Sequence, residues 1–414
     1  MKALLNARLL DPASGRDERG SLLIADGRIL ALGPDLAIPE QAERIDCKGQ
    51  AVMPGLIDMR AFAVDAASAL AGGITTVILM PDRTPPLDNA AMIANCARPE
   101  PEAGRPRVRP MGAATQGLGG TAMAELGLMA EAGAVGFTDG RRAIGDTLIM
   151  RRLLEYSSLF DLPIVQHAED PSLAAGGVMN AGETATRLGL PGIPDIAETI
   201  MIERDARLLE LGKGRLHIAQ ISARRSLDAV RDAKARGLPL SVGISPQHFL
   251  LNETAVGDYR TFCHVSPPLR SEADRHALVA AIGEGLIDVI CSGHDPRDQD
   301  AKRLPFSESE PGIVGFETLL PLALALHHNE GVPLLPLLGM LTAQPAAILG
   351  LEEGRLAPGA PADVLVVDLE RPSVIDPGTF RSETQNTPFE GLPVQGKVLM
   401  TIIAGELRFE ETDR

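Results

Sequence analysis

Chemically reactive side chains in this chain follow short apolar runs. His167 follows the run PIVQ, Asp139 follows AVGFT, and His294 follows VICSG. Imidazole and carboxylate groups bind metal ions and transfer protons, so these positions could form a catalytic or metal-binding site. The run AVMPGLIDM is different, because Arg60 and Phe62 come after it and neither side chain can bind a cation. The sequence therefore allows two interpretations: a metal site that has lost some of its ligands, or a site that never bound a metal.

Eight apolar runs alternate with amphipathic segments through the middle of the chain. We expect strands at AVMPGLIDM, GITTVILMP, RVRPMGAA, AVGFTD, PIVQHAE, RLHIAQIS, LPLSVGIS and IDVICSGHD. Helices are expected between most of them, for example at 195–212 and at 222–237, where Leu227, Val230 and Ala233 share one face. The runs are apolar throughout, as in parallel strands buried on both faces. This α/β pattern favours a (β/α)8 TIM barrel, and a doubly wound open sheet is the alternative.

Both ends of the chain are rich in expected strands. The stretch GSLLIADGRILALG holds two apolar runs around Asp26-Gly27, a strong hairpin signal, and PADVLVVDL and GKVLMTIIAGELRF near the other end are similar short runs. We therefore expect residues 1–50 and 355–414 to pair into one small composite β domain. The barrel would occupy residues 51–354.

In a barrel of this kind the functional site lies at the carboxyl ends of the strands. A hydrolytic zinc site needs three or four His, Asp, Glu or Cys ligands at one point. Arg60 would place a permanent positive charge where the metal belongs, and Gln220 is a poor zinc ligand, so we do not predict a binuclear zinc site. Structural roles stay open as well. Arg60 could form a buried ion pair with Asp58, and His167 could be a hydrogen-bonded core histidine.

Composition limits the partners and the compartment. The chain has 414 residues, of which 45% are hydrophobic and 23% charged, as in globular proteins. Its net charge of −16 argues against nucleic acid and anionic membranes as partners. No two of its four cysteines have C-x-x-C spacing, and no apolar run is long enough for a signal peptide or a membrane span. We therefore expect a cytoplasmic protein.

Longer motifs in this chain resemble those of one enzyme family. The stretches VMPGLIDM, AGGITTVILMPDRTPPLDN, QHAED, LGLPGIPDIAE, VSPPLRSEADRHAL, GIVGFET and NTPFEGLPVQGKVLMTIIAGE follow one another almost from end to end. Together they resemble the dihydroorotases of the amidohydrolase superfamily, specifically the long bacterial type. The resemblance implies a (β/α)8 barrel with a composite β-sandwich built from both termini.

The chain departs from this resemblance at the positions that carry the chemistry. Active members follow IDM with His-x-His and a Leu-Arg-Asp-Pro-Gly loop, whereas this chain has Arg60 and Phe62 and the loop looks deleted. The resemblance also implies a His at Gln220, an Asn at Ser266 and a catalytic Asp at Gly293. Further implied changes are Asp82 for a substrate-binding Asn, and Asp139 or Gly140 for an Asp-Asp pair. We therefore expect a vestigial pocket formed by Asp58, Arg60, Phe62, Asp82, Asp139, His167, Gln220, Ser266, Gly293 and His294.

The resemblance implies a dihydroorotase-like protein of pyrimidine biosynthesis that lacks activity. Inactive paralogues in this family are structural partners of aspartate transcarbamoylase, so we expect its catalytic chain as the partner, no cofactor and a homo-oligomer. The alternative is an active dihydroorotase or other cyclic-amide hydrolase that uses His167, Asp139 and His294 with an atypical zinc site. A third possibility is a regulatory module that holds a small carboxylate through Arg60. Whether the chain is an enzyme is thus an open question at this point.

Overall fold

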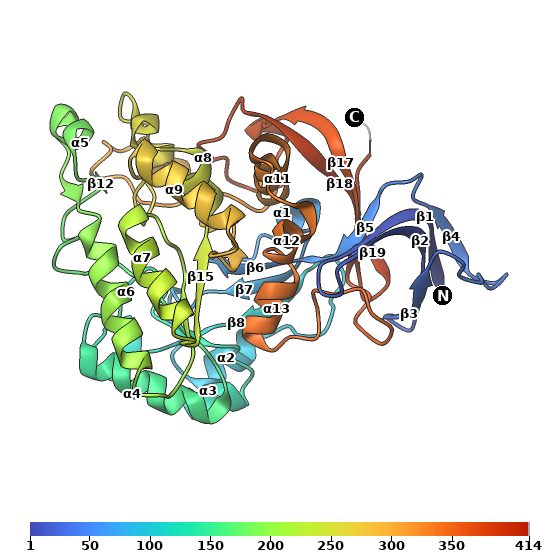
Figure 1. Ribbon diagram of the computed structural model, residues 1–414, viewed down its shortest axis with the longest axis horizontal. Helices are drawn as coiled ribbons and strands as arrows, with labels where there is room; N and C mark the ends of the chain where they lie inside the picture. The colour runs from blue at the N-terminus through green and yellow to red at the C-terminus, as the bar shows by residue number, and fades with distance from the viewer. Residues whose placement is uncertain (413–414) are drawn as a thin grey trace.

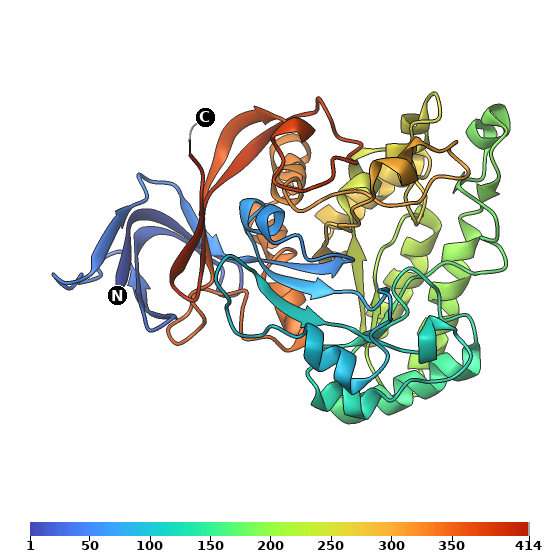
Figure 2. The same cartoon turned by 180° about the vertical axis from the view of Figure 1, so that it is seen from behind.

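The two ends of the chain meet in one eight-stranded sheet. In the computed structural model, which describes residues 1–412, the strand order of this sheet is β19-β18-β17-β5-β1-β2-β3, and β4 pairs with β1. Figures 1 and 2 show the N-terminal and C-terminal strands side by side at one end of the molecule. The strands are β1 (Lys2–Asp11), β2 (Arg16–Ala25), β3 (Arg28–Gly33), β4 (Glu43–Asp46), β5 (Ala51–Pro54), β17 (Val364–Val374), β18 (Pro393–Ile403) and β19 (Glu406–Glu410).

The expected hairpin at Asp26-Gly27 is confirmed. Strands β2 and β3 pair antiparallel, and both turn residues have positive φ, 49° at Asp26 and 74° at Gly27. Ala404 and Gly405 repeat this conformation between β18 and β19, with φ values of 49° and 75°. Two-residue turns with two positive φ angles match the twist of antiparallel strands. The turn residues therefore set the register at both ends of the sheet.

All eight strands expected in the middle of the chain are present and pair in parallel. They form two sheets, of order β6-β7-β8 and β16-β15-β14-β11-β10-β9. A separate short pair, β12 (Met179–Asn180) and β13 (Gly192–Ile193), stands apart from them. The strands of the two sheets are β6 (Leu56–Ala61), β7 (Ile74–Leu79), β8 (Arg107–Pro110), β9 (Gly112–Ala113), β10 (Phe137–Thr138), β11 (Ile164–Gln166), β14 (Leu216–Ile218), β15 (Leu240–Ile244) and β16 (Val289–Ile290).

The two parallel sheets are linked at both of their edges. Only Met111 separates β8 from β9, so the third expected strand belongs to both sheets. At the other edge, Ala61 forms a parallel bridge to His294, and the Phe62 amide donates to the His294 carbonyl at 2.9 Å. Parallel pairing brings the carboxyl ends of these strands to the same side of the molecule. The predicted α/β class is confirmed.

Helices cover the outer surface of the parallel strands, as α4, α6 and α7 show in Figure 1. The expected helices at 195–212 and 222–237 are α6 (Ile196–Leu209) and α7 (Arg224–Ala235), and α7 buries Leu227, Val230 and Ala233 as predicted. The other helices are α1 (Ala66–Ala71), α2 (Ala90–Cys96), α3 (Leu126–Glu131), α4 (Thr147–Ser157), α5 (Glu183–Leu188), α8 (Pro246–Leu250), α9 (Glu272–Gly283), α10 (Gln299–Arg303), α11 (Leu319–Glu330), α12 (Leu334–Gly339) and α13 (Ala343–Leu349). No helix within residues 1–412 is long and apolar enough to cross a membrane.

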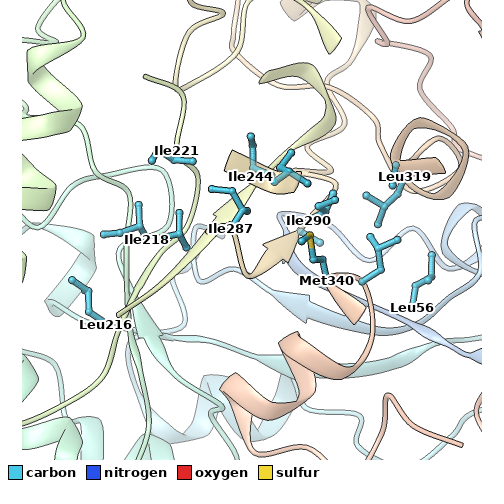
Figure 3. Close-up of a cluster of buried hydrophobic side chains, with 14 of the residues drawn as sticks. Leu56, Leu216, Ile218, Ile221, Ile244, Ile287, Ile290, Leu319 and Met340 are labelled. Atoms are coloured by element: carbon cyan, nitrogen blue, oxygen red, sulfur yellow. The ribbon is translucent and has the colours of Figure 1, made fainter. Parts of the chain in front are cut away.

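The largest apolar core lies between the parallel strands and the helices around them. Figure 3 shows part of it, in which side chains from β6, β14, β15 and β16 meet those of α11 and the segment after α12. Leu56, Ile218, Ile244, Ile290 and Leu319 in this cluster are fully buried. Large, well-packed apolar cores hold their elements rigidly. The strand ends that carry polar side chains are therefore fixed in position.

The predicted boundary at residue 51 needs a correction. Strand β5 (Ala51–Pro54) pairs with β1 and β17, so it belongs to the terminal sheet and not to the central unit. Only β6, which begins at Leu56, pairs with the parallel strand β7. The apolar run AVMPGLIDM thus contains two buried strands of different sheets, and only Gly55 separates them.

Candidate functional site

Five of the ten predicted pocket residues line one small cavity at the strand ends. They are Arg60, Phe62, Gln220, Ser266 and Gly293, and the cavity volume is about 30 Å³. The other five lie around it. His167 contacts Arg60 and Ser266, Asp82 contacts the cavity residue Arg141, and Asp58, Asp139 and His294 make hydrogen bonds elsewhere. The predicted strand ends thus lie close together, but only five of the ten predicted residues line the cavity.

Arg60 is buried without an ionic partner. Its exposed fraction is 3%, and no carboxylate oxygen within residues 1–412 lies within 4 Å of its guanidinium. Its Nη2 makes only long contacts of 3.5 Å, to the Gly140 carbonyl and to His167 Nδ1, and its Nη1 has no partner in this part of the chain. Burial lowers the pKa of Arg60, the nearby Cys291, Asp82 and Asp295 act against this effect, and Arg141 adds to it. The guanidinium is therefore a buried charge with acidic groups nearby but no direct ion pair.

The expected ion pair between Arg60 and Asp58 is wrong. The Asp58 carboxylate accepts hydrogen bonds from the Ser292 amide at 2.9 Å and from the Ser292 hydroxyl. Its only contact with Arg60 is a 3.3 Å hydrogen bond from the Arg60 backbone amide. Ser292, which follows β16, offers two donors directly beside β6. Asp58 therefore ties β6 to the segment after β16 instead of neutralising the guanidinium.

Phe62 lies between two guanidinium groups. The Cζ atom of Arg141 is 3.8 Å from the centre of the Phe62 ring, and the Cζ atom of Arg60 is 5.2 Å from it. Both distances are within the range of cation–π attraction. Phe62 thus supplies the electron-rich face of a ring at a position where a histidine would supply a lone pair.

Gln220 fills the space beside Gly293. Its Nε2 donates to the Ser245 hydroxyl, so the side chain is held across the cavity. Gly293 has a φ of +64°, and a Cβ built on it would lie 3.1 Å from Gln220 Nε2. An aspartate at position 293 would therefore have to adopt a left-handed backbone conformation and displace the Gln220 amide by a few tenths of an ångström.

Asp82 occupies the space that a side chain at position 140 would need. Gly140 has a φ of +65°, and a Cβ built on it would lie 1.4 Å from Asp82 Oδ1. Asp82 Oδ2 accepts from the Arg141 amide at 2.8 Å, which holds the carboxylate there. Asp139 points elsewhere, because its two oxygens accept from the amide and the hydroxyl of Thr115. An adjacent pair of acids facing one point is thus replaced by Asp82 alone.

The two histidines at the strand ends have structural partners. Arg60 Nη2 can only donate, so His167 Nδ1 accepts and the proton lies on Nε2, 3.1 Å from the Ser266 hydroxyl. His294 Nδ1 accepts from the Gly315 amide at 3.2 Å, and its ring stacks on Phe316 with a 3.7 Å separation of ring centres. Burial lowers the pKa of His294 to about 3, so it stays neutral. The expectation that His167 is a hydrogen-bonded core histidine agrees with these contacts.

The side chains at this site do not fit a zinc ion. Within residues 1–412, no three His, Cys, Asp or Glu side chains are arranged to hold a metal. Zinc needs at least three such ligands, whereas here a guanidinium, a phenyl ring and an amide fill the centre of the strand ends. A cation placed beside the unpaired Arg60 would be repelled in a low-dielectric cavity.

Comparison with known proteins identifies the family. Residues 49–226 match the family model described as dihydro-orotase-like. The chain is 41% identical to a dihydroorotase of Syntrophotalea carbinolica, with all of both chains covered, and 40% identical to one of Anaplasma phagocytophilum, with 98% of this chain and 94% of the relative covered. The chain belongs to the dihydroorotase family. Among solved structures, the L-hydantoinase of Arthrobacter aurescens matches 99% of this chain and 96% of its own at 25% identity, with a TM-score of 0.87.

Arg141 is a residue of the cavity that the dihydroorotase resemblance did not predict. Arg141 donates two hydrogen bonds to Asp295, at 2.9 and 2.7 Å, and covers the Phe62 ring. It also lies 3.5 Å from Asp82. Its place two residues after Asp139, at the end of an expected strand, was the signal that could have pointed to it. Arg141 and Asp295 form the closed side of the cavity.

Replacing Asp58 with asparagine is expected to change how stability depends on pH. Burial raises the pKa of Asp58 to about 6, from 3.8. The folded chain therefore loses stability as pH rises through this range, by up to roughly 3 kcal/mol above pH 6. An asparagine keeps partners for Ser292 and cannot ionise. In urea unfolding from pH 4.5 to 7.5, Asp58→Asn should gain stability relative to the unchanged chain up to about pH 6 and then level off.

The matched control for this series is Asp26→Asn, at the exposed turn between β2 and β3. Its stability difference from the unchanged chain should not vary over the same pH range. A flat difference for Asp58→Asn would show that Asp58 is ionised throughout and stabilised by its Ser292 bonds.

Proposed function

We propose that this chain is a dihydroorotase-like protein of pyrimidine biosynthesis that no longer catalyses hydrolysis. The observation that carries the proposal is the buried Arg60, with Phe62 beside it, at the positions where the family resemblance places His-x-His. Metal-assisted hydrolysis needs a bound cation and a base that activates water. Arg60 opposes the first requirement, and Gly293 offers no side chain for the second.

We further propose that residues 51–354, apart from β5, form a (β/α)8 barrel of the amidohydrolase type, and that residues 1–50 and 355–414 together with β5 form a composite β-sandwich beside it. The links at both edges of the parallel sheets support a closed barrel. The chain would act in the cytoplasm.

The partner we propose is the catalytic chain of aspartate transcarbamoylase, bound by a homo-oligomer of this chain. The chain matches a relative over the full length of both, while the family resemblance implies other residues at the site, which is the pattern expected when the surface keeps a role that the site has lost. The partner itself comes from the resemblance to inactive members of the family.

The test combines an activity assay with a binding assay. Purified protein should hydrolyse dihydroorotate no faster than buffer, while the Syntrophotalea carbinolica dihydroorotase serves as the positive control for the assay. Aspartate transcarbamoylase from the organism that encodes this chain should elute with the tagged chain at a fixed ratio in size-exclusion chromatography. Steady turnover would contradict the inactive role, and separate elution of the two proteins would contradict the scaffold role.

The alternative is an active cyclic-amide hydrolase, as the names of the relatives suggest. It would have to use His167, Asp139 and His294, but each of them is held by other hydrogen bonds. Turnover that disappears in His167→Ala would support this alternative.

A further inference from the structure

The guanidinium groups around this cavity differ in their ion pairs. Arg141 pairs with Asp295 and Asp82, and Arg297 pairs with Asp295 at 3.0 Å and with Glu310 at 2.5 Å. Arg60 lines the same cavity, is 97% buried, and has no ion pair within the described part of the chain. A buried ion without a counter-charge is costly, so a negative partner from solution would be strongly favoured.

Unused hydrogen-bonding atoms face this cavity. Arg60 Nη1 is buried and has no partner among residues 1–412, and the same holds for Gln247 Oε1. The oxygen and nitrogen of a glutamine amide are exchanged by a simple rotation, so Gln247 can present a donor instead. The Ser266 hydroxyl also lines the space. The donors therefore come from three separate segments of the chain and converge on one small volume.

The volume limits the size of the ligand. About 30 Å³ leaves room for only a few non-hydrogen atoms. The Phe62 ring forms an apolar side wall, which suits a flat group better than a tetrahedral one. A guanidinium matches the two oxygens of a carboxylate group in geometry as well as in charge.

We propose that this cavity binds a small, flat, singly charged oxyanion, either a short carboxylate of the size of formate or acetate or a bicarbonate, with Arg60 as the principal donor. The site lies where the family resemblance places a metal, and it has the opposite preference for charge. The proposal is independent of the proposed function, because an anion could bind whether or not the chain hydrolyses a substrate or holds a partner.

Thermal unfolding in a chloride-free buffer tests the proposal. Formate, acetate and bicarbonate are added separately, and sulfate serves as a tetrahedral control that stabilises proteins in general. At a concentration about a hundredfold above its Kd, the preferred anion should raise Tm by about 3 °C more than sulfate does. Calorimetric titration at pH 8 then distinguishes bicarbonate from the carboxylates by its heat. Equal shifts with sulfate, or no heat with any of the three flat anions, would overturn the proposal.

The decisive variant is Arg60→Met, which removes the charge and keeps an apolar side chain of similar length. It should bind the anion at least tenfold more weakly and lose the specific Tm shift, while in the absence of anion its Tm should equal or exceed that of the unchanged chain. Arg355→Met is the matched control, because Arg355 is exposed and outside the cavity. An unchanged anion response in Arg60→Met would contradict the assignment.

A second measurement does not depend on any variant. Crystals of the unchanged protein are transferred to sodium bromide, and the anomalous signal locates the ion. We expect a bromide peak within hydrogen-bonding distance of Arg60 Nη1. Adding formate at one fiftieth of the bromide concentration should remove this peak. A cavity without bromide, or a bromide that formate leaves in place, would contradict it.

Discussion

Replacing Gly140 with aspartate is expected to destabilise the folded protein by about 2–4 kcal/mol. The change returns an acidic pair to the stretch FTDG, where the family resemblance implies Asp-Asp. The new Cβ would lie 1.4 Å from Asp82 Oδ1, and the residue would have to adopt a φ of +65°. A second buried carboxylate beside Asp82 adds charge repulsion. Urea unfolding followed by circular dichroism measures the loss.

Two further variants separate the causes of this effect. Gly140→Ala removes the added charge but keeps the collision, so it should still be strongly destabilised. Combining Gly140→Ala with Asp82→Ala removes the collision and should recover most of the loss, leaving about 1 kcal/mol for the positive φ. If Gly140→Asp is as stable as the unchanged chain, Asp82 does not occupy this space and the site is open to a restored acid.

Replacing Arg107 with methionine is expected to cost about 3–5 kcal/mol of stability, because it leaves the buried Asp363 without its ionic partner. Arg107 on β8 donates to Asp363 at 2.6 and 3.2 Å and lies 3.8 Å from Glu353. The side chains of both acids are only 2% exposed. Asp363 stands next to β17, so this ion pair joins the central strands to the terminal sheet. The urea midpoint should fall accordingly.

The control for Arg107 is the double variant Arg107→Met with Asp363→Leu. An apolar pair in place of a buried ion pair is often tolerated, so the double variant should be more stable than Arg107→Met alone. Arg83→Met at an exposed position should change the stability little. An Arg107→Met variant with unchanged stability would mean that Asp363 takes up a proton or finds water.

Much of the fold could be predicted because the signals are local. Each of the eight expected parallel strands exists, since long apolar runs between amphipathic segments have few other ways to bury both faces. The hairpin at Asp26-Gly27 follows from the backbone freedom of its turn residues. The change of sheet between β5 and β6 was not predicted, because apolar residues continue from one strand into the other and only Pro54-Gly55 marks the change.

The arrangement inside the site was harder to predict, since it depends on contacts between distant segments. Asp58 and Arg60 are two residues apart, which suggested an ion pair, but Ser292 from the far end of the central unit offers Asp58 better donors. In the same way, Asp82 fills the space above Gly140 although 58 residues separate them in the chain. Residue types, together with the family resemblance, predicted which ligands are replaced. Only the three-dimensional packing shows what now fills their space.

The most direct test of the account is the zinc content of the purified protein, measured by elemental mass spectrometry after expression in zinc-supplemented medium. We predict far less than one zinc ion per chain, because Arg60, Phe62 and Gln220 stand where the family resemblance implies ligands and no three suitable side chains converge within residues 1–412. One or more zinc ions per chain, retained through dialysis and lost in His167→Ala, would contradict the account and would point to an active hydrolase.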